Sequence, residues 1–428
     1  MLILARSSRL LISPTRLRTR PFPVPRRDAT EGFSMVANPE FKGSSPNGWT
    51  AGKATGGNNV VTSDTRGKTT SSTSDGVFDT KFNGDDEPST DDNIAASAVN
   101  LFYVSNLMHD ITYQYGFTEK AGNFQKDNFG KGGQDGDAVV VNVLNTSKVN
   151  NANFFAPPDG QPGEMNMFRF TYTTPSRSGG FDNGIPIHEY GHGVSVRLTG
   201  GSATGECLGT DEAGGMGEGW SDMMALFVLA KESDTATTSI PMGAYVAGKP
   251  EVYWSLVTKH GFSANLHDAK QSAGNIVAMQ NIIGGLMTQP CNPTFLSARD
   301  AIVAADASYY KGANKCEILK AFAKRGLGSK ATSSRKSDFS VPSECDGNAP
   351  SPDPTATDTE ETTTTTKRSR TTTKKTKTTA TEEATTTTKR SRTTTKRSRT
   401  TSRAPEPTDE PDDPTDDPTF ELDEFAKM

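Results

Sequence analysis

"IPIHEYGHGVSVRL", residues 185–198, carries two of the five histidines in a chain of 428 residues. His188 and His192 stand four positions apart, and Glu189 directly follows the first of them. The stretch predicts an α-helix, on which positions i and i+4 lie one above the other on the same face. Two imidazole nitrogens on that face can bind one metal ion such as zinc. The alternative is an amphipathic helix whose two histidines have no common partner.

A metal ion held by two helical histidines needs a further protein ligand. The stretch "DEAGGMGEGWSDMMALFVLA", residues 211–230, offers four candidate carboxylates: Asp211, Glu212, Glu218 and Asp222. Glu218 and Asp222 are four apart where an apolar helix begins, so one can bind the metal while the other accepts the free ring N–H of a histidine. Acids at a helix start otherwise complement the helix dipole. Combined with the histidines, these acids favour a metal centre, with Glu189 beside it as a general base acting on water.

The flanking sequence predicts an α+β architecture. A long helix is expected to begin at Asp91 or Asp92 and to end at Gly116. Two short segments rich in β-branched or aromatic residues, 137–145 and 167–174, predict strands. From Ile185 the pattern becomes helical, with helices expected over 185–198, 217–231, 272–288, 295–308 and 316–325. The histidine helix therefore stands at the junction of a β-containing half and a helical half, a common position for a cleft.

Composition divides the chain into three parts. Residues 1–35 are expected to be a leader of uncertain nature, since they are rich in arginine and poor in acids. Residues 36–345 are long enough for one large domain. Residues 346–428 are rich in Thr, Lys and Arg and then acidic, with hardly an apolar residue, and we expect this tail to be disordered. No apolar run approaches the ~18 residues that span a membrane, and the four cysteines permit three disulfide pairings.

The tail contains the sequence "KRSR" three times. Such clusters can bind nucleic acid or another polyanion, but the acidic block that follows opposes phosphate binding. We therefore expect no nucleic-acid partner and favour a solvated Thr/Pro-rich stalk. Contact of the tail with a cell wall or a polyanion is the alternative.

The spacing of the two motifs resembles that of the thermolysin-like glutamate zincins. "HEYGH", residues 188–192, is followed after 25 residues by "EGWSD", residues 218–222. This matches H-E-x-x-H with a downstream E-x-x-x-D. Several further stretches are similar to the fungalysin family of secreted fungal metallopeptidases: "GFTEKAGNFQ" (116–125), "NNANFFAPPDGQPGEMNM" (150–167), "QPCNPTFLSARDAIVAAD" (289–306) and "GANKCEILKAFAKRGLG" (312–328). The likeness extends over residues 35–332.

The resemblance implies a thermolysin-like two-lobed fold, with a β-containing N-terminal lobe, a mainly helical C-terminal lobe and the zinc helix at their junction. It implies one catalytic zinc ion and a secreted endopeptidase, from a family made as zymogens, that hydrolyses extracellular proteins or peptides. The same likeness implies that His188, His192 and Glu218 are the zinc ligands and that Glu189 is the catalytic base. Asp222 would be the hydrogen-bond partner of His188. Asn151 and Ala152 would lie on the edge strand that aligns the substrate.

The chain departs from the family pattern in three respects. Family members usually carry a secretory signal and a long inhibitory propeptide before the catalytic domain, whereas residues 1–35 here are unrelated to either. The family motif usually reads H-E-Y-T-H, and Gly191 replaces the threonine. The domain is also expected to be shortened near Gly248, where related sequences have a longer, histidine-bearing segment; His260 and His267 are the nearest histidines. The alternative function is therefore a catalytically impaired zinc-binding protein that lacks part of the substrate cleft.

Overall fold

The structure is a computed structural model of the whole chain. It describes residues 17–50, 52–64, 67–70, 76–209, 211–231, 233–234, 238–249, 254–257 and 271–346, with the backbone alone at 254–257, 271–273 and 275. His260, His267 and the tail from residue 347 lie outside the described residues. No helix in the described part of the chain is both long and apolar enough to cross a membrane.

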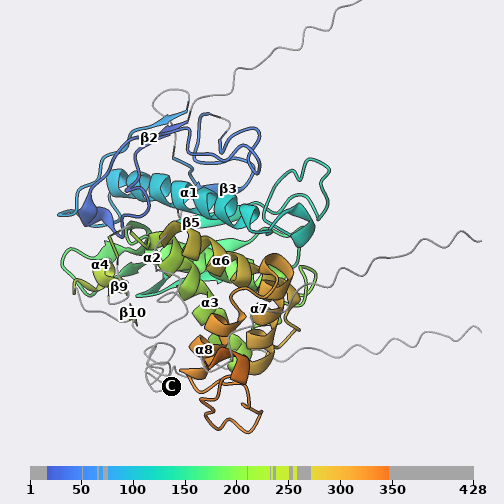
Figure 1. Cartoon of the computed structure of the whole chain (residues 1–428). Coiled ribbons are helices and arrows are strands. Elements are labelled where there is room, and N and C mark those ends of the chain that lie inside the picture. The colour runs from blue at the N-terminus through green and yellow to red at the C-terminus, as the bar shows by residue number, and fades with distance from the viewer. Residues whose placement is uncertain are drawn as a thin grey trace, which may run out of the picture. The chain divides into compact units, whose positions relative to one another are not determined.

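One long helix, α1 (Asp91–Gln114), forms the centre of the N-terminal half. Asp91 and Asp92 lie in its first turn, where a negative charge is stabilised by the helix dipole. The chain leaves the helix at Gly116, whose φ of 116° favours glycine. Most of its side chains are buried, because a sheet covers one side and other helices cover another (Figure 1). The helix predicted from the sequence is therefore present, with the expected ends.

A five-stranded sheet packs against α1, in the order β3-β5-β7-β6, with β8 also paired to β7. β3, β5 and β7 run parallel, whereas β6 and β8 are antiparallel to β7. β6 is an end strand of this order and pairs only with β7 among the described strands. The sheet consists of β3 (Val60–Ser63), β5 (Val139–Val149), β6 (Ala152–Phe155), β7 (Glu164–Phe170) and β8 (Arg177–Ser178).

Two smaller sheets complete the strands of the described chain. One has the order β2-β1-β4, and the other pairs β9 with β10. Their bounds are β1 (Arg18–Thr19), β2 (Val36–Ala37), β4 (Val77–Phe78), β9 (Ser239–Met242) and β10 (Trp254–Val257). Short 3-10 turns lie at η1 (Ala29–Glu31), η2 (Glu119–Ala121), η3 (Gly179–Phe181) and η5 (Ser343–Cys345).

The C-terminal half is mainly helical, which confirms the predicted α+β, two-lobed class. Helix α2 lies between the two halves, since it contacts α1 and β6 on one side and α3 on the other (Figure 1). Two disulfides, Cys207–Cys291 and Cys316–Cys345, link segments of this half. The helices are α2 (Gly184–Leu198), α3 (Asp211–Leu229), α4 (Ala244–Ala247), α6 (Gln271–Thr288), α7 (Phe295–Tyr310) and α8 (Lys315–Ala323).

The N-terminal boundary of the packed chain differs from the expected one. Residues 1–35 were expected to be a leader, yet Leu17 and Phe22 are fully buried in the hydrophobic core. β1 pairs with β4, and the side-chain amide of Asn183 donates to the carbonyl of Phe22. Composition hid this packing because the few apolar residues here are separated by arginines and prolines. The described residues of the leader are therefore part of the domain from Leu17 onward.

Candidate metal centre

His188 and His192 lie on one face of α2, as their spacing predicts. Their ring centroids are 4.7 Å apart, and the side chains keep 17% and 19% of their surface exposed. The rest of this helix is largely buried, including Ile187, Tyr190 and Val194 in the core. The apolar residues thus anchor the helix and leave the two imidazoles facing outward, where an ion can reach them.

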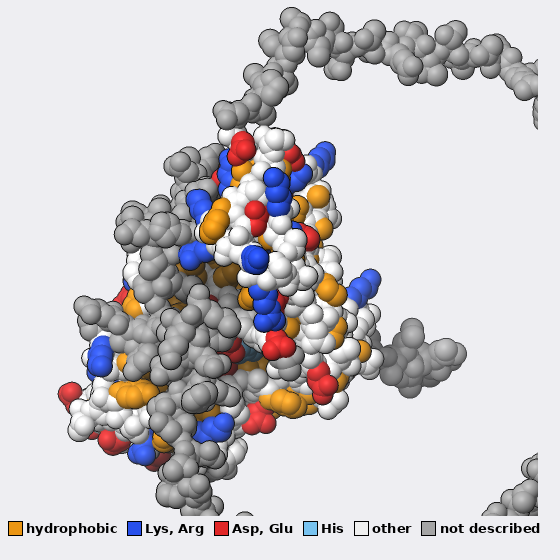
Figure 2. Space-filling view, turned by 90° about the horizontal axis from the view of Figure 1, so that it is seen from below, with side chains coloured by type: hydrophobic (Ala, Val, Ile, Leu, Met, Phe, Trp, Pro, Cys, Tyr) orange, Lys and Arg blue, Asp and Glu red, His pale blue; other side chains and the backbone are white. Residues whose placement is uncertain are grey.

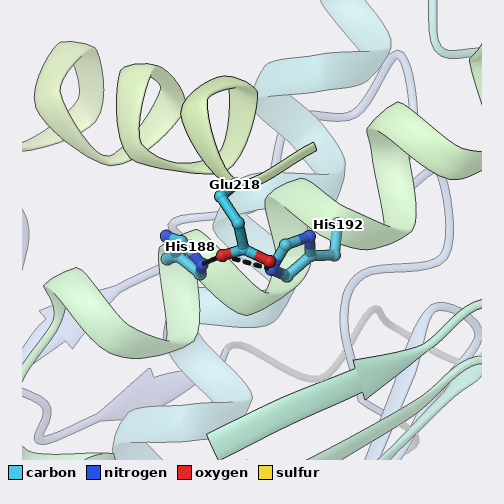
Figure 3. Close-up of side chains that lie close together, drawn as sticks. All are labelled: His188, His192 and Glu218. Atoms are coloured by element: carbon cyan, nitrogen blue, oxygen red, sulfur yellow. Dashed lines mark hydrogen bonds and ion pairs between the residues drawn. The ribbon is translucent and has the colours of Figure 1, made fainter. Parts of the chain in front are cut away.

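Glu218 completes the cluster from the neighbouring helix α3. Its Oε2 atom lies 3.1 Å from Nε2 of His188 and 3.5 Å from Nε2 of His192. Figure 3 shows its carboxylate between the two imidazoles, with all three side chains pointing toward one another. Helices α2 and α3 approach closely where Gly191 faces Ser221, since a Cβ atom on Gly191 would lie 2.8 Å from the Cα atom of Ser221. Gly191 therefore stands where the two helices that carry the cluster are in close contact.

The geometry of the cluster fits a metal ion. The ligand atoms of His188, His192 and Glu218 all lie within 4.8 Å of one another. Zinc binds nitrogen and oxygen at ~2.0–2.1 Å, so two ligands at tetrahedral positions are about 3.3 Å apart. The observed separations of 3.1 and 3.5 Å from Glu218 agree with this value. Two histidines and a carboxylate are also a donor set typical of a catalytic zinc site with one open position.

Asp222 holds the ring of His188 from behind. Its Oδ1 atom lies 2.7 Å from Nδ1 of His188, so Nε2 of the same ring is directed at the cluster. Burial alone would lower the pKa of His188, but hydrogen bonds with Asp222 and Glu218 raise it to about 10. Burial acts to raise the pKa of Glu218, but its contacts with His188 and His192 hold it well below its usual range. A protonated His188 and the carboxylate of Glu218 therefore form an ion pair in the metal-free protein.

Glu189 lies on the same helix, between the two histidines in sequence, and only 6% of its surface is exposed. Burial raises the pKa of its carboxyl, against the opposing effect of His192 and His188. Its Oε2 atom is buried and has no hydrogen-bond partner among the described residues. A buried carboxylate with a free oxygen beside a metal cluster is available to accept a proton from water.

The cluster is open to solvent. Glu218 keeps 49% of its side-chain surface exposed. Figure 2 shows a histidine side chain in a hollow of the surface, together with acidic side chains. This histidine belongs to the cluster, because His109, the other histidine of the described chain, is 1% exposed. A molecule from solvent can therefore reach the ligands.

The other candidate residues occupy different places. Ala152 begins β6 and Asn151 immediately precedes it, at the edge of the sheet beside α2. Phe154 of the same strand contacts Tyr190 of α2, with ring centroids 6.3 Å apart. Glu212 lies outside the cluster, where its carboxylate accepts from the backbone N–H of Phe295. Asp211 is exposed at the start of α3, and neither acid belongs to the metal cluster.

The sequence of this chain matches the family model of fungalysin metallopeptidase (M36) over residues 20–251 and 250–331. The two stretches together cover more than half of the chain and include every residue of the metal cluster. The chain belongs to the fungalysin family. The match is divided at residues 250–251, next to Gly248, where the sequence suggests a missing segment. The family implies a metal cofactor, and His188, His192 and Glu218 form a group that could hold one.

Curated relatives of this fungalysin are extracellular metalloproteinases of fungi. It is 45% identical over 280 residues to the extracellular metalloproteinase MEP of Pyricularia oryzae, covering 55% of this chain and 44% of that protein. It is 43% identical over 298 residues to the extracellular metalloproteinase mep of Aspergillus flavus, covering 59% and 47%. The extracellular metalloproteinase 4 of Arthroderma otae is 43% identical over 279 residues, covering 54% and 43%. The aligned region thus spans less than half the length of these relatives.

The sequence pattern predicted that His188, His192 and Glu218 come together, but not the close contact between their helices. Gly191 was noted only as a departure from the family motif, and Ser221 was not singled out. A signal was present, because both motifs carry a small residue that can face the other helix. Its meaning depends on how α2 and α3 pack, and that packing is not encoded in either motif alone.

Proposed function

We propose that this chain is a zinc-dependent endopeptidase that hydrolyses peptide bonds of extracellular proteins. The observation that carries the proposal is the convergence of His188, His192 and Glu218, whose ligand atoms all lie within 4.8 Å of one another. Glu189 stands beside this cluster, buried and with a free carboxylate oxygen. Membership of the fungalysin metallopeptidase family gives the same chemistry.

The residues of the site have separate tasks in this reaction. His188, His192 and Glu218 would hold the zinc ion, which when bound supplies a Lewis acid that polarises a carbonyl group and makes water more acidic. Glu189 accepts the proton of the attacking water and then gives it to the leaving amine. Its raised pKa suits this double role, because a general base works best when its pKa is near the working pH. Asp222 keeps the ring of His188 in the orientation that binding requires.

The edge strand β6 is the proposed binding site for the substrate backbone. One side of β6 pairs with β7, and no described strand pairs with its other side. An extended peptide can add to such an edge through main-chain hydrogen bonds. Asn151 and Ala152, at the start of this strand, are the residues that we assign to aligning the substrate.

Secretion is part of the proposal, since relatives that share over two fifths of the aligned residues are named extracellular. Two disulfides in the described chain support an oxidising compartment. Contact of the tail with a cell wall or polyanion concerns residues outside the described part. Deleting residues 346–428 tests that contact, because unchanged binding to a polyanion matrix would exclude it.

The proposed activity is tested with zinc content and protein cleavage together. The purified chain is expected to bind one zinc ion and to cleave casein, and 1,10-phenanthroline is expected to abolish cleavage. Glu189→Gln should keep the zinc and lose about 10²–10⁴-fold in rate, since general-base catalysis contributes that much. Glu206→Gln, at an exposed loop position, is the matched control and should change neither. If zinc binds stoichiometrically and no protein is cut, the chain is a zinc-binding protein and the proposal is wrong.

A further inference from the structure

Arg197, near the end of α2, is fully buried and lies five residues after His192. Its guanidinium stacks on Phe124, with the carbon atom 4.3 Å from the ring centroid. It also donates four hydrogen bonds: Nε to the carbonyl of Pro157 at 2.6 Å, Nη1 to the carbonyl of Gly122 at 2.8 Å and to Oδ2 of Asp137 at 2.9 Å, and Nη2 to the carbonyl of Gln161 at 2.9 Å. Two of these carbonyls belong to the loop between β6 and β7. One side chain of the metal helix thus holds the loop that follows the edge strand.

A second contact joins β6 itself to the metal helix. The ring of Phe154 lies between two glycines, Gly193 of α2 and Gly163 of the loop. A Cβ atom on Gly193 would lie 2.8 Å from Cε1 and Cζ of Phe154, and one on Gly163 would lie 2.8 Å from Cζ. Gly193 directly follows His192, so this contact is adjacent in sequence to a metal ligand. A Cβ atom at position 193 would also lie 2.9 Å from Cε2 of Phe124, so a side chain there must shift the rings of Phe154 and Phe124. Because Phe154 belongs to β6, this shift changes how the strand packs on the metal helix.

Both contacts set the distance between strand β6 and the metal helix α2. Phe154 fixes the middle of β6 on α2, and Arg197 fixes the loop that begins one residue after the end of the strand. A buried arginine whose acceptors are mostly backbone carbonyls determines where that backbone lies, whatever its net effect on stability. The free edge of β6 therefore has a defined separation from His188 and His192.

We infer that Arg197 and the Gly193–Phe154 contact are positioning elements that fix the edge of β6 relative to the metal ligands. An extended peptide that pairs with β6 is thereby held with one peptide bond at the metal centre. The inference rests on the proposed function. Neither element touches the substrate or the metal, and both act through the strand.

The test separates peptide positioning from metal binding. Gly193→Ala and Arg197→Lys are compared with the parent in zinc affinity, measured by chelator competition, and in KM and kcat for peptides of increasing length. The same substitutions in zinc-loaded Glu189→Gln give the Kd of the uncleaved peptides. Gly219→Ala is the matched control, because a Cβ atom there meets nothing within 4 Å.

If the two elements position the substrate, their variants should lose more affinity and activity for longer peptides. Gly193→Ala and Arg197→Lys should lower kcat/KM about 10–100-fold for peptides long enough to pair with β6, as expected for a misplacement of about 1 Å. The KM and Kd of these peptides should rise. The shortest substrates should change little, and zinc affinity should stay within about threefold. Phe154→Leu removes the ring atoms nearest to position 193 but leaves the contact with Phe124, so the double variant Gly193→Ala/Phe154→Leu should recover part of the loss.

Two results overturn the inference while leaving the proposed function intact. One is an active parent whose variants bind long peptides as well as the parent does. The other is an equal loss for every peptide length together with an equal loss of zinc affinity, which would mark a general distortion of the site. A parent that neither binds nor cuts peptides overturns the proposed function and this positioning role together. Gly193→Ala decides the outcome even if Arg197→Lys does not fold.

Discussion

The imidazole of His188 is held from two sides by carboxylates of one helix: Nδ1 lies 2.7 Å from Asp222, and Nε2 lies 3.1 Å from Glu218. The four-residue spacing of these acids on α3 places them one helical turn apart. These two contacts therefore fix the imidazole ring in one orientation, in which each ring nitrogen faces a carboxylate. That orientation leaves Nε2 directed at the position where His192 and Glu218 also converge.

Asp222 is expected to support metal affinity without binding the metal. Asp222→Asn keeps the shape of the side chain but weakens the hydrogen bond that orients His188 and raises its basicity. Such changes behind a metal ligand typically cost 10–100-fold in affinity, and we expect a loss in that range. Competition with a fluorescent chelator measures it. Asp211→Asn, at an exposed position of the same helix, is the control, and an Asp222→Asn affinity equal to that of this control would contradict the prediction.

The metal-free protein is expected to lose stability as the pH rises, because of His188. Its pKa is about 10 in the folded protein, against ~6.5 in an unfolded chain. A raised folded pKa contributes stability that is complete below pH ~6.5 and is lost as the pH rises through the folded value. Each pH unit between the two values corresponds to at most about 1.4 kcal/mol.

Urea denaturation of the chelator-treated protein at several pH values between 6 and 10 measures this loss. The free energy of unfolding of the parent should fall across that range relative to that of His188→Gln, which lacks the titrating group. Parallel curves for the two proteins would show that the ion pair contributes nothing. Added zinc should reduce the difference between pH values, because zinc binds the deprotonated ring.

Asp110 is expected to be the most sensitive polar residue of α1. The pKa of this buried carboxylate is held low, because several donors outweigh the effect of burial. Its partners are the backbone N–H of Phe41, the hydroxyls of Ser44 and Ser45, the indole N–H of Trp49 and the ring of His109. Asp110→Ala leaves these buried donors unpaired and should cost more than about 3 kcal/mol of unfolding free energy.

Asp110→Asn keeps one accepting oxygen and should fall between Asp110→Ala and the parent. Asp92→Asn, exposed at the start of the same helix, should change the free energy of unfolding by no more than about 0.5 kcal/mol. Urea denaturation in excess zinc measures all three variants. Equal stability of Asp110→Ala and Asp92→Asn would show that the donors around Asp110 find other partners.

The sequence predicted helices and strands best where the pattern of apolar residues within the segment determines the element. Helix α2 was expected over residues 185–198 and runs from Gly184 to Leu198, because its apolar spacing is regular. Helix α3 was expected from residue 217 but begins at Asp211. Four glycines in its first nine residues argue against a helix in isolation, and packing against neighbouring helices, mainly α2, offsets that cost. β5 likewise extends to Val149, beyond the predicted residue 145, because β7 pairs with it up to that residue.

The residues of the metal cluster could be predicted because their spacing is local, whereas the packing of their helices could not. The spacings of His188 to His192 and of Glu218 to Asp222 are each set within one helix, so the sequence contains them. By contrast, the contact between Gly191 and Ser221 joins segments that are remote in sequence. So do the hydrogen bonds of Arg197 to its four acceptors. Nothing in either segment alone states that they meet.

The disulfide pairing is a further relation that the sequence left open, and it leads to a last prediction. Cys207–Cys291 joins residues 84 apart, whereas Cys316–Cys345 joins residues 29 apart. A cross-link stabilises mainly by restricting the unfolded chain, by about 4.5 kcal/mol for the longer loop and about 3.5 kcal/mol for the shorter one. Replacing both cysteines of the first pair by alanine should therefore lower the free energy of unfolding by about 1 kcal/mol more than replacing the second pair. Urea denaturation of the two double variants measures the difference, and the opposite order would show that strain or packing, and not loop length, governs these cross-links.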